Sequence, residues 1–136
     1  MPAKVFFDTN VLIYALADDD SRSARAEELL EAGGLISVQV LHEFTSIARK
    51  KLLLSWAEVA EAISAFLTFC PSPLPITMEL HSAARKIAEK YGCGIYDALI
   101  IASALDAGCT VLSSEDLQDG QCINGQLTIR NPFKAE

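Results

Sequence analysis

Four acidic residues stand in apolar surroundings, where an ionised carboxylate is costly unless a cation or hydrogen-bond donors compensate it. Asp8 and Asp97 are each flanked on both sides by apolar residues. Glu43 interrupts the apolar face of a predicted helix, and Asp116 closely follows an apolar run. Taken singly, each acid has an ordinary structural explanation, such as a helix cap or an ion pair with an arginine. Their number calls for a shared explanation.

Carboxylates that converge in one crevice repel each other, so they either hold protons at raised pKa or bind hard divalent cations. Oxygen ligands without histidine or cysteine favour Mg²⁺ or Mn²⁺ over zinc. One or two such ions can polarise a phosphodiester, generate a hydroxide nucleophile and stabilise the leaving oxygen. Hydrolysis of phosphodiester bonds is therefore the leading chemistry that the four acids predict.

The elements that would carry these acids alternate between strands and helices. Helical spacing, with serine or threonine caps at Ser37, Ser55 and Thr77, predicts most of the helices. Residues 18–20 are expected to be a solvated cap, and Asn124-Gly125 predicts a hairpin turn before 127–129. Strands are expected at 4–7, 35–36 and 110–113, and helices at 11–16, 21–32, 37–51, 55–69, 78–91 and 96–107. This alternation predicts a single α/β domain with a mostly parallel sheet and helices on both faces.

Such a sheet would bring the acids together. Ligands of open parallel sheets bind beyond the carboxyl ends of the strands. Asp8 ends the first predicted strand and Asp116 follows the third. Asp97 begins a helix, where anionic side chains are favoured. Glu43, a turn and a half into its own helix, can reach the same crevice.

The chain as a whole is both acidic and apolar. Its 136 residues include 18 Asp and Glu against 11 Lys and Arg, a net charge of −7, and 51% are hydrophobic. These values exclude a disordered chain and a generic basic nucleic-acid coat. No apolar run approaches the roughly 18 residues of a membrane span, and the N-terminus lacks a signal-peptide layout. We therefore expect a cytoplasmic protein without membrane contact, whose four cysteines are reduced thiols.

Four motifs, in order along the chain, resemble those of PIN-domain proteins, and specifically VapC-type toxins of toxin–antitoxin pairs. They are FFDTNVLIY, SVQVLHEF, YGCGIYDALIIASALDAGCTVLSSEDLQDGQ and the closing NPF. The resemblance covers essentially the whole chain and implies one PIN-like domain over residues 1–136, with three α/β/α layers. It also implies an endoribonuclease that depends on one or two Mg²⁺ or Mn²⁺ ions and serves as the toxin of a type II pair.

The same resemblance implies roles for individual residues. Asp8 and Asp97 would be direct metal ligands, whereas Glu43 and Asp116 would bind through water or orient it. Asp119 is a further candidate acid, although turn chemistry in its Gln-Asp-Gly segment explains it equally well. The side chains that would support the ligands with hydrogen bonds are Thr9, Asn10 and Ser114.

Three partners follow from the resemblance: an RNA substrate, a small antitoxin whose C-terminal segment covers the site, and a second copy in a homodimer. Apolar residues within 11–16 and 59–67 are candidate antitoxin or dimer surfaces, although most of them are expected in the core. The cluster Arg49-Lys50-Lys51, at the end of the helix that carries Glu43, is the leading candidate to contact RNA phosphates.

Other readings compete with this one. An aspartate-nucleophile phosphatase would have a second acid where this chain has Asn10. A receiver domain would need adjacent acids at the first strand and a lysine where this chain has Ser113-Ser114-Glu115. A non-catalytic PIN-fold binding module and a stand-alone RNA-processing nuclease without an antitoxin both stay open. Metal titration followed by an RNA cleavage assay would separate these alternatives.

Overall fold

The computed structural model describes residues 3–17 and 21–134, so the predicted cap at 18–20 lies outside the described residues. This part of the chain forms six helices and four strands: one strand comes first, the six helices follow it, and the other three strands come last. In order they are β1 (Val5–Phe7), α1 (Thr9–Leu16), α2 (Ser21–Ala32), α3 (Val38–Lys50), α4 (Trp56–Phe69), α5 (Met78–Tyr91), α6 (Ile95–Asp106), β2 (Val111–Ser113), β3 (Cys122–Ile123) and β4 (Leu127–Arg130).

The sheet has the order β1-β2-β4-β3, in which the first three strands are parallel and β3 is antiparallel to β4. Phe7, Ser113 and Arg130 lie side by side in the register, so β1, β2 and β4 end at the same edge. The strand predicted at 35–36 was wrong: only an isolated bridge joins Leu35 to Phe6. The two residues between Gly34 and the helix cap Ser37 are too few to extend the pairing.

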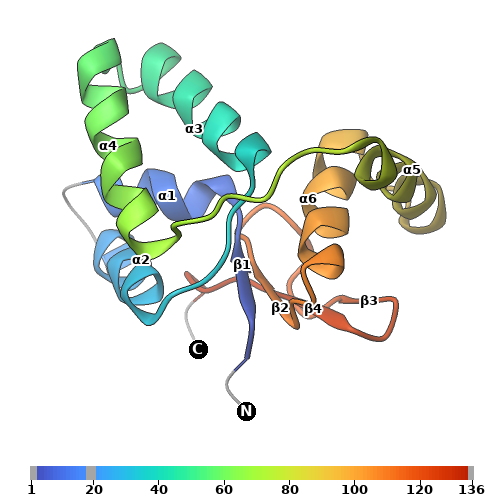
Figure 1. Cartoon of the computed structure of the whole chain (residues 1–136). Helices are drawn as coiled ribbons and strands as arrows, with labels where there is room; N and C mark the ends of the chain where they lie inside the picture. Colours follow the sequence, from blue (N-terminus) through green and yellow to red (C-terminus); the bar gives the residue numbers. More distant parts are fainter. Residues whose placement is uncertain (1–2, 18–20, 135–136) are drawn as a thin grey trace.

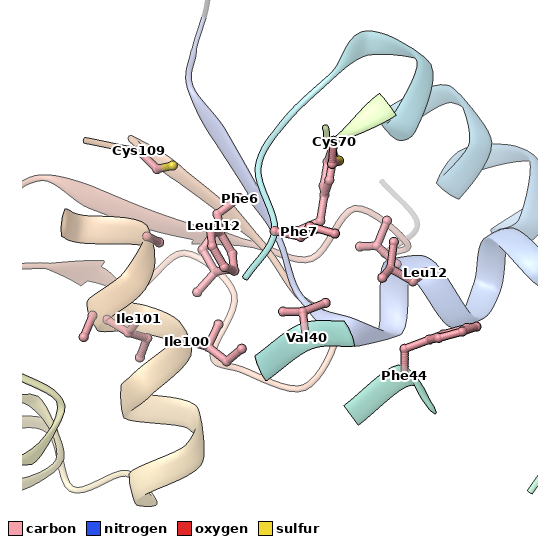
Figure 2. Packing of buried hydrophobic residues seen from close by; sticks show 14 of the residues in the cluster. Phe6, Phe7, Leu12, Val40, Phe44, Cys70, Ile100, Ile101, Cys109 and Leu112 are labelled. Atoms are coloured by element: carbon pink, nitrogen blue, oxygen red, sulfur yellow. The ribbon is translucent and has the colours of Figure 1, made fainter. Parts of the chain in front are cut away.

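Helices cover both faces of the sheet, which confirms the three-layer α/β/α prediction. Figure 1 shows α1 to α4 on one side and α5 and α6 on the other. Because side chains alternate along a strand, Phe6 turns with Leu112 towards α6, as Figure 2 shows, whereas Phe7 turns towards Val40. These four side chains are at most 1% exposed and belong to one continuous core.

The predicted serine and threonine caps set where three helices begin. The hydroxyls of Ser37, Ser55 and Thr77 accept from the backbone N–H three residues ahead, and Ser55 forms a full capping box with Glu58. Such caps typically contribute about 1 kcal/mol each. Helix α6 differs, because its N-cap is Gly94, which has no side chain to cap the helix.

Gly34 allows the chain to pass close to β1 before it enters α3. A Cβ at this position would lie 2.6 Å from Cε2 of Phe7 and 2.9 Å from the carbonyl oxygen of Val5. The backbone of Leu35 can therefore bond to β1, with Phe7 donating its N–H to the Leu35 carbonyl at 2.9 Å. This approach brings the start of α3, and hence Glu43, to the edge where β1 ends.

Two further predictions hold for the described residues. Asn124 and Gly125, both with positive φ, turn the chain between the antiparallel strands β3 and β4. All four cysteines are free, and Cys70 and Cys109 are buried. No helix in residues 3–17 and 21–134 is long and apolar enough to cross a membrane.

Candidate active site

Asp8 lies where β1 ends and caps α1. It is 6% exposed, and each of its carboxylate oxygens accepts one short hydrogen bond. Oδ1 accepts from the backbone N–H of Thr9 and Oδ2 from the hydroxyl of Ser114, both at 2.7 Å. Its own N–H donates to the carbonyl of Ser113 at 3.0 Å. The adjacent ends of β1 and β2 therefore fix this side chain in one orientation.

Glu43 faces Asp8 across the start of α1 and is held from two sides. The Thr9 hydroxyl donates to Oε1 at 2.8 Å, and the amide Nε2 of Gln39 donates to Oε2 at 2.9 Å. The same Nε2 also donates to the carbonyl of Tyr96 in the first turn of α6, at 2.9 Å. Sequence reasoning missed Gln39, although its position four residues before Glu43 places both on one helix face.

Asp116 follows β2 and is joined to α1 through Asn10. The Asn10 Nδ2 donates to Oδ2 of Asp116 at 3.2 Å, while its Oδ1 accepts from the N–H of Glu115 at 3.3 Å. The Ser114 hydroxyl oxygen accepts from the N–H of Asp116 and holds this turn against Asp8. All three supporting residues predicted from the sequence, Thr9, Asn10 and Ser114, thus contact the predicted acids.

The four predicted acids share one electrostatic neighbourhood. Burial raises the pKa of Asp8 to about 6; the hydrogen bonds from Ser114 and Thr9 oppose this rise, and the charges of Glu43 and Asp116 add to it. Asp97, exposed in the first turn of α6, also has a raised pKa, caused by partial desolvation and then by the charges of Asp116 and Glu43. The sheet edge and α6 therefore bring these carboxylates close enough to repel.

No positive side chain compensates this repulsion in the part of the chain that the structure describes. None of its salt bridges involves Asp8, Glu43, Asp97 or Asp116. The donor set consists of oxygen atoms alone, which suits Mg²⁺ or Mn²⁺. Within residues 3–17 and 21–134, no three acidic, histidine or cysteine side chains are close enough to hold an ion in their present positions. The chemistry of the donors therefore fits a hard cation, although the carboxylates are spread further apart than in a closed metal site.

Asp119 is not brought to this cluster. Its Oδ1 accepts from the N–H of Asn131 at 2.8 Å, and its Oδ2 lies 3.5 Å from the Lys134 ammonium. The hydrogen bond from Asn131 lowers its pKa. Asp119 thus fastens the loop after β2 to the segment that follows β4.

The basic cluster predicted to contact RNA lies at the corner between α3 and α4. The Arg49 guanidinium is 4.4 Å from the ring centre of Trp56 and donates to the carbonyl of Leu54 at 2.8 Å. Lys50 and Lys51 are exposed beside it. Seven residues of helix separate Glu43 from Lys50, or about 10 Å along the axis. Of the three, Arg49 is engaged in joining the two helices.

An apolar groove runs over the end of α1. It consists of three adjoining hollows, and Leu16 lines each of them. We call it the Leu16 groove. The hollow between α1, α2 and α4 has a volume of about 280 Å³, and the two that adjoin it have volumes of about 340 and 300 Å³. Its acidic lining residues are Glu27, Glu31, Glu58 and Glu61. Of the surfaces predicted at 11–16 and 59–67, it includes Leu16, Ala62 and Ala65, whereas Val11 and Val59 are buried in the core.

Comparison with known proteins supports this architecture. A family model described as PIN domain matches residues 5–118. A chain of a toxin–antitoxin complex from Klebsiella pneumoniae is 22% identical with a TM-score of 0.74, and the match covers 97% of this chain and 100% of that one. VapC20 of Mycobacterium tuberculosis, a toxin that cleaves the sarcin–ricin loop, is 18% identical with a TM-score of 0.67, over 83% and 90% of the two chains.

A third structure, VapBC2 from Rickettsia felis bound to a DNA fragment from its promoter, is 20% identical to this chain. Its TM-score is 0.67, and the match covers 93% of this chain and 97% of that one. No curated protein matches the chain by sequence. At these identities, the likeness to the solved structures shows a common fold.

Proposed function

This chain belongs to the PIN-domain family, and we propose that it is a Mg²⁺- or Mn²⁺-dependent endoribonuclease that acts as the toxin of a toxin–antitoxin pair. One observation supports the catalytic part most directly. The charges of Glu43 and Asp116 raise the pKa of both Asp8 and Asp97 near the edge where the parallel strands end, and none of the four acids forms a salt bridge among the described residues. Such an arrangement is costly unless a cation binds there.

Some residues of the site would bind a cation, and others orient the acids that bind it. In the proposal Asp8 and Asp97 bind it directly, and Glu43 and Asp116 bind through water. When bound, one or two such ions polarise the scissile phosphodiester and stabilise the leaving oxygen. Thr9 orients two acids at once, since its N–H bonds to Asp8 and its hydroxyl to Glu43. The carboxylates of Asp97 and Asp116 are the exposed members of the set, and that of Asp116 accepts a hydrogen bond from Asn10.

A pair of variants on one helix tests the activity. Asp97 lies in the first turn of α6 and Asp106 is its last residue, about 14 Å away along the axis. We expect Asp97→Asn to reduce Mn²⁺-dependent cleavage of RNA by at least 100-fold and Asp106→Asn to leave it unchanged. Removal of the metal with EDTA should abolish cleavage by the unmodified chain. If the unmodified chain cleaved RNA no faster than Asp97→Asn, so that only background cleavage remained, a non-catalytic PIN-fold module would be favoured.

The Leu16 groove supports the proposal of an antitoxin partner. Its floor is apolar, and its acidic side chains come from α2 and α4. A segment that carries apolar residues flanked by lysine or arginine would complement both features. We assign this groove to an apolar segment of an antitoxin encoded by a neighbouring small gene.

Co-expression tests that assignment. The product of the neighbouring gene should co-purify with the chain, and Ala65→Asp, which places a charge on the apolar floor, should release it. Glu89→Gln on α5, outside the groove, is the matched control. If Ala65→Asp still bound the partner, the interface would lie on another surface of the chain. Absence of any bound product would favour a stand-alone RNA-processing nuclease.

The proposal also includes a homodimer in the cytoplasm. Exposed apolar side chains outside the groove, such as Met78 at 73% and Tyr96 at 72%, offer surface for a second copy. Light scattering of the purified chain should give twice its mass of 14.7 kDa. A mass of 14.7 kDa across the micromolar range would reject the dimer while leaving the nuclease proposal intact.

A further inference from the structure

Gln39 connects the two helices that carry predicted acids on opposite sides of the site. It is 5% exposed, near the start of α3. Its single Nε2 donates at 2.9 Å to Oε2 of Glu43, on its own helix, and at 2.9 Å to the carbonyl of Tyr96. Tyr96 directly precedes Asp97 in the first turn of α6. One amide group therefore fixes both Glu43 and the backbone next to Asp97.

The chemistry of the neighbours determines how this amide is oriented. A carboxylate and a backbone carbonyl are both acceptors, so only the NH₂ end of the side chain can face them. The Gln39 Oε1 is consequently turned away, and it is buried without a hydrogen-bond partner among the described residues. A buried acceptor left in this state is unfavourable. The two bonds made by Nε2 are thus retained in spite of an unsatisfied oxygen on the same group.

We infer that Gln39 is a positioning residue of the proposed nuclease, which sets the distance between Glu43 and the turn that carries Asp97. The inference rests on the proposed function and adds a residue outside the four acids and their predicted supports. The bond to Glu43 is charge-assisted and therefore stronger than a neutral one. The bond to Tyr96 uses a carbonyl at the start of α6, so it joins α6 to α3 where the cation would bind. Without Gln39, the acids would be less well placed before the cation arrives.

Gln39→Met isolates this role. Methionine has the same length and flexibility and fills the same buried space, but it donates no hydrogen bond. Gln126→Met is the matched control, since the Gln126 Nε2 likewise donates two hydrogen bonds. Its acceptors are the carbonyls of Leu105 and Cys109, both at 3.3 Å and away from the acids. Thermal unfolding without metal, measured on both variants, verifies that each is folded.

Binding of Mn²⁺ to the full chain, measured without RNA from the electron paramagnetic resonance signal of free Mn²⁺, is the primary readout. Loss of a group that orients a metal ligand typically weakens affinity 10- to 100-fold, so we expect at least a tenfold higher Kd for Gln39→Met and no change for Gln126→Met. In cleavage assays, the Mn²⁺ concentration for half-maximal rate should rise by the same factor. Saturating Mn²⁺ should restore kcat, with KM for RNA unchanged.

Three results would contradict the inference, and they are distinguishable. If the unmodified chain binds Mn²⁺ and cleaves RNA, and Gln39→Met has the same Mn²⁺ affinity, only the role of Gln39 is rejected. If the unmodified chain neither binds Mn²⁺ nor cleaves RNA, the proposed function is rejected together with the inference. A Gln39→Met variant whose kcat stays low at saturating Mn²⁺, with unaltered affinity, would also contradict a role in placing the ligands.

Discussion

At the scale of single residues, Asp8 combines two opposing requirements. Its carboxylate is fixed by two short hydrogen bonds, yet it is buried and close to other acids. The hydrogen bonds stabilise the charged form, while burial and repulsion favour the protonated form more strongly, so the pKa rises from its ordinary value of 3.8 to about 6. The charged residue therefore makes the metal-free fold less stable at neutral pH.

This conflict predicts a pH dependence of stability with a definite sign. Between pH 4 and 6 the folded chain binds the Asp8 proton more tightly than the unfolded chain does, so the free energy of unfolding falls as the pH rises through this range. The loss reaches about 3 kcal/mol and is complete above pH 6. Urea denaturation of the metal-free chain and of Asp8→Asn, from pH 4 to 8, should show this component only in the former. If the free energies of unfolding of the two proteins changed with pH in parallel, the predicted contribution of Asp8 would be contradicted.

Metal binding should offset the loss in free energy of unfolding that the charged Asp8 causes. A cation that binds only the folded chain adds about 2.7 kcal/mol at a concentration of 100 times its Kd. We expect Mn²⁺ at pH 7.5 to raise the Tm of the chain and to leave that of Asp8→Asn unchanged. Asp119→Asn, which removes an acid outside the cluster, should respond to Mn²⁺ as the unmodified chain does. An equal rise in Asp8→Asn would place the bound ion elsewhere.

At the scale of elements, two glycines have opposite consequences for stability. Gly34→Ala would bring a Cβ to 2.6 Å from the Phe7 ring, in a tightly packed core that cannot yield cheaply, and should destabilise the chain by about 1–3 kcal/mol. Gly94 is the N-cap of α6, has an extended backbone, and would give a Cβ open space. Gly94→Ser should supply the missing side-chain cap and stabilise the chain by a few tenths of a kcal/mol. Denaturant midpoints of the two variants should therefore move in opposite directions.

The same scale shows what the sequence can and cannot predict. Caps such as Ser37 and the pair Ser55 and Glu58 are local signals, so the helix starts that depend on them were predicted correctly. The bridge at Leu35 was mistaken for a strand because apolar residues do not reveal how far pairing extends. Gln39 was missed because its second contact, the Tyr96 carbonyl, lies 57 residues away in the chain. The four acids were predicted as a group from their apolar surroundings and their places in the predicted α/β layout, but long-range hydrogen bonds between elements could not be predicted in this way.

At the scale of the whole molecule, the distribution of charge bears on RNA binding. In the proposed function, a chain of net charge −7 would bind a polyanion through local basic groups, and Lys50 and Lys51 are exposed. In the Asp97→Asn background, which prevents cleavage, the double change Lys50→Glu and Lys51→Glu should weaken RNA binding. It should also flatten the dependence of log K on log salt, by about 0.7 for each lost phosphate contact.

The double change Arg85→Glu and Lys86→Glu, on α5 on the other side of the sheet, is the control for charge alone. It should alter the salt slope less than the double change at Lys50 and Lys51 does. If both double changes gave the same slope, long-range charge would explain RNA affinity and the corner between α3 and α4 would have no special part in it.

The contact between Arg49 and Trp56 has an optical consequence. Trp56 is the single tryptophan of the chain, 65% exposed, and its ring lies beside a guanidinium. Its neighbours along the chain, Leu54 and Glu58, line the Leu16 groove, whereas the acids lie at the strand ends. The tryptophan emission of the protein therefore reports from the corner between α3 and α4, beside the Leu16 groove. A titration with the proposed antitoxin that changes this emission, in the absence of RNA and metal, would follow occupation of the groove, separately from events at the carboxylates.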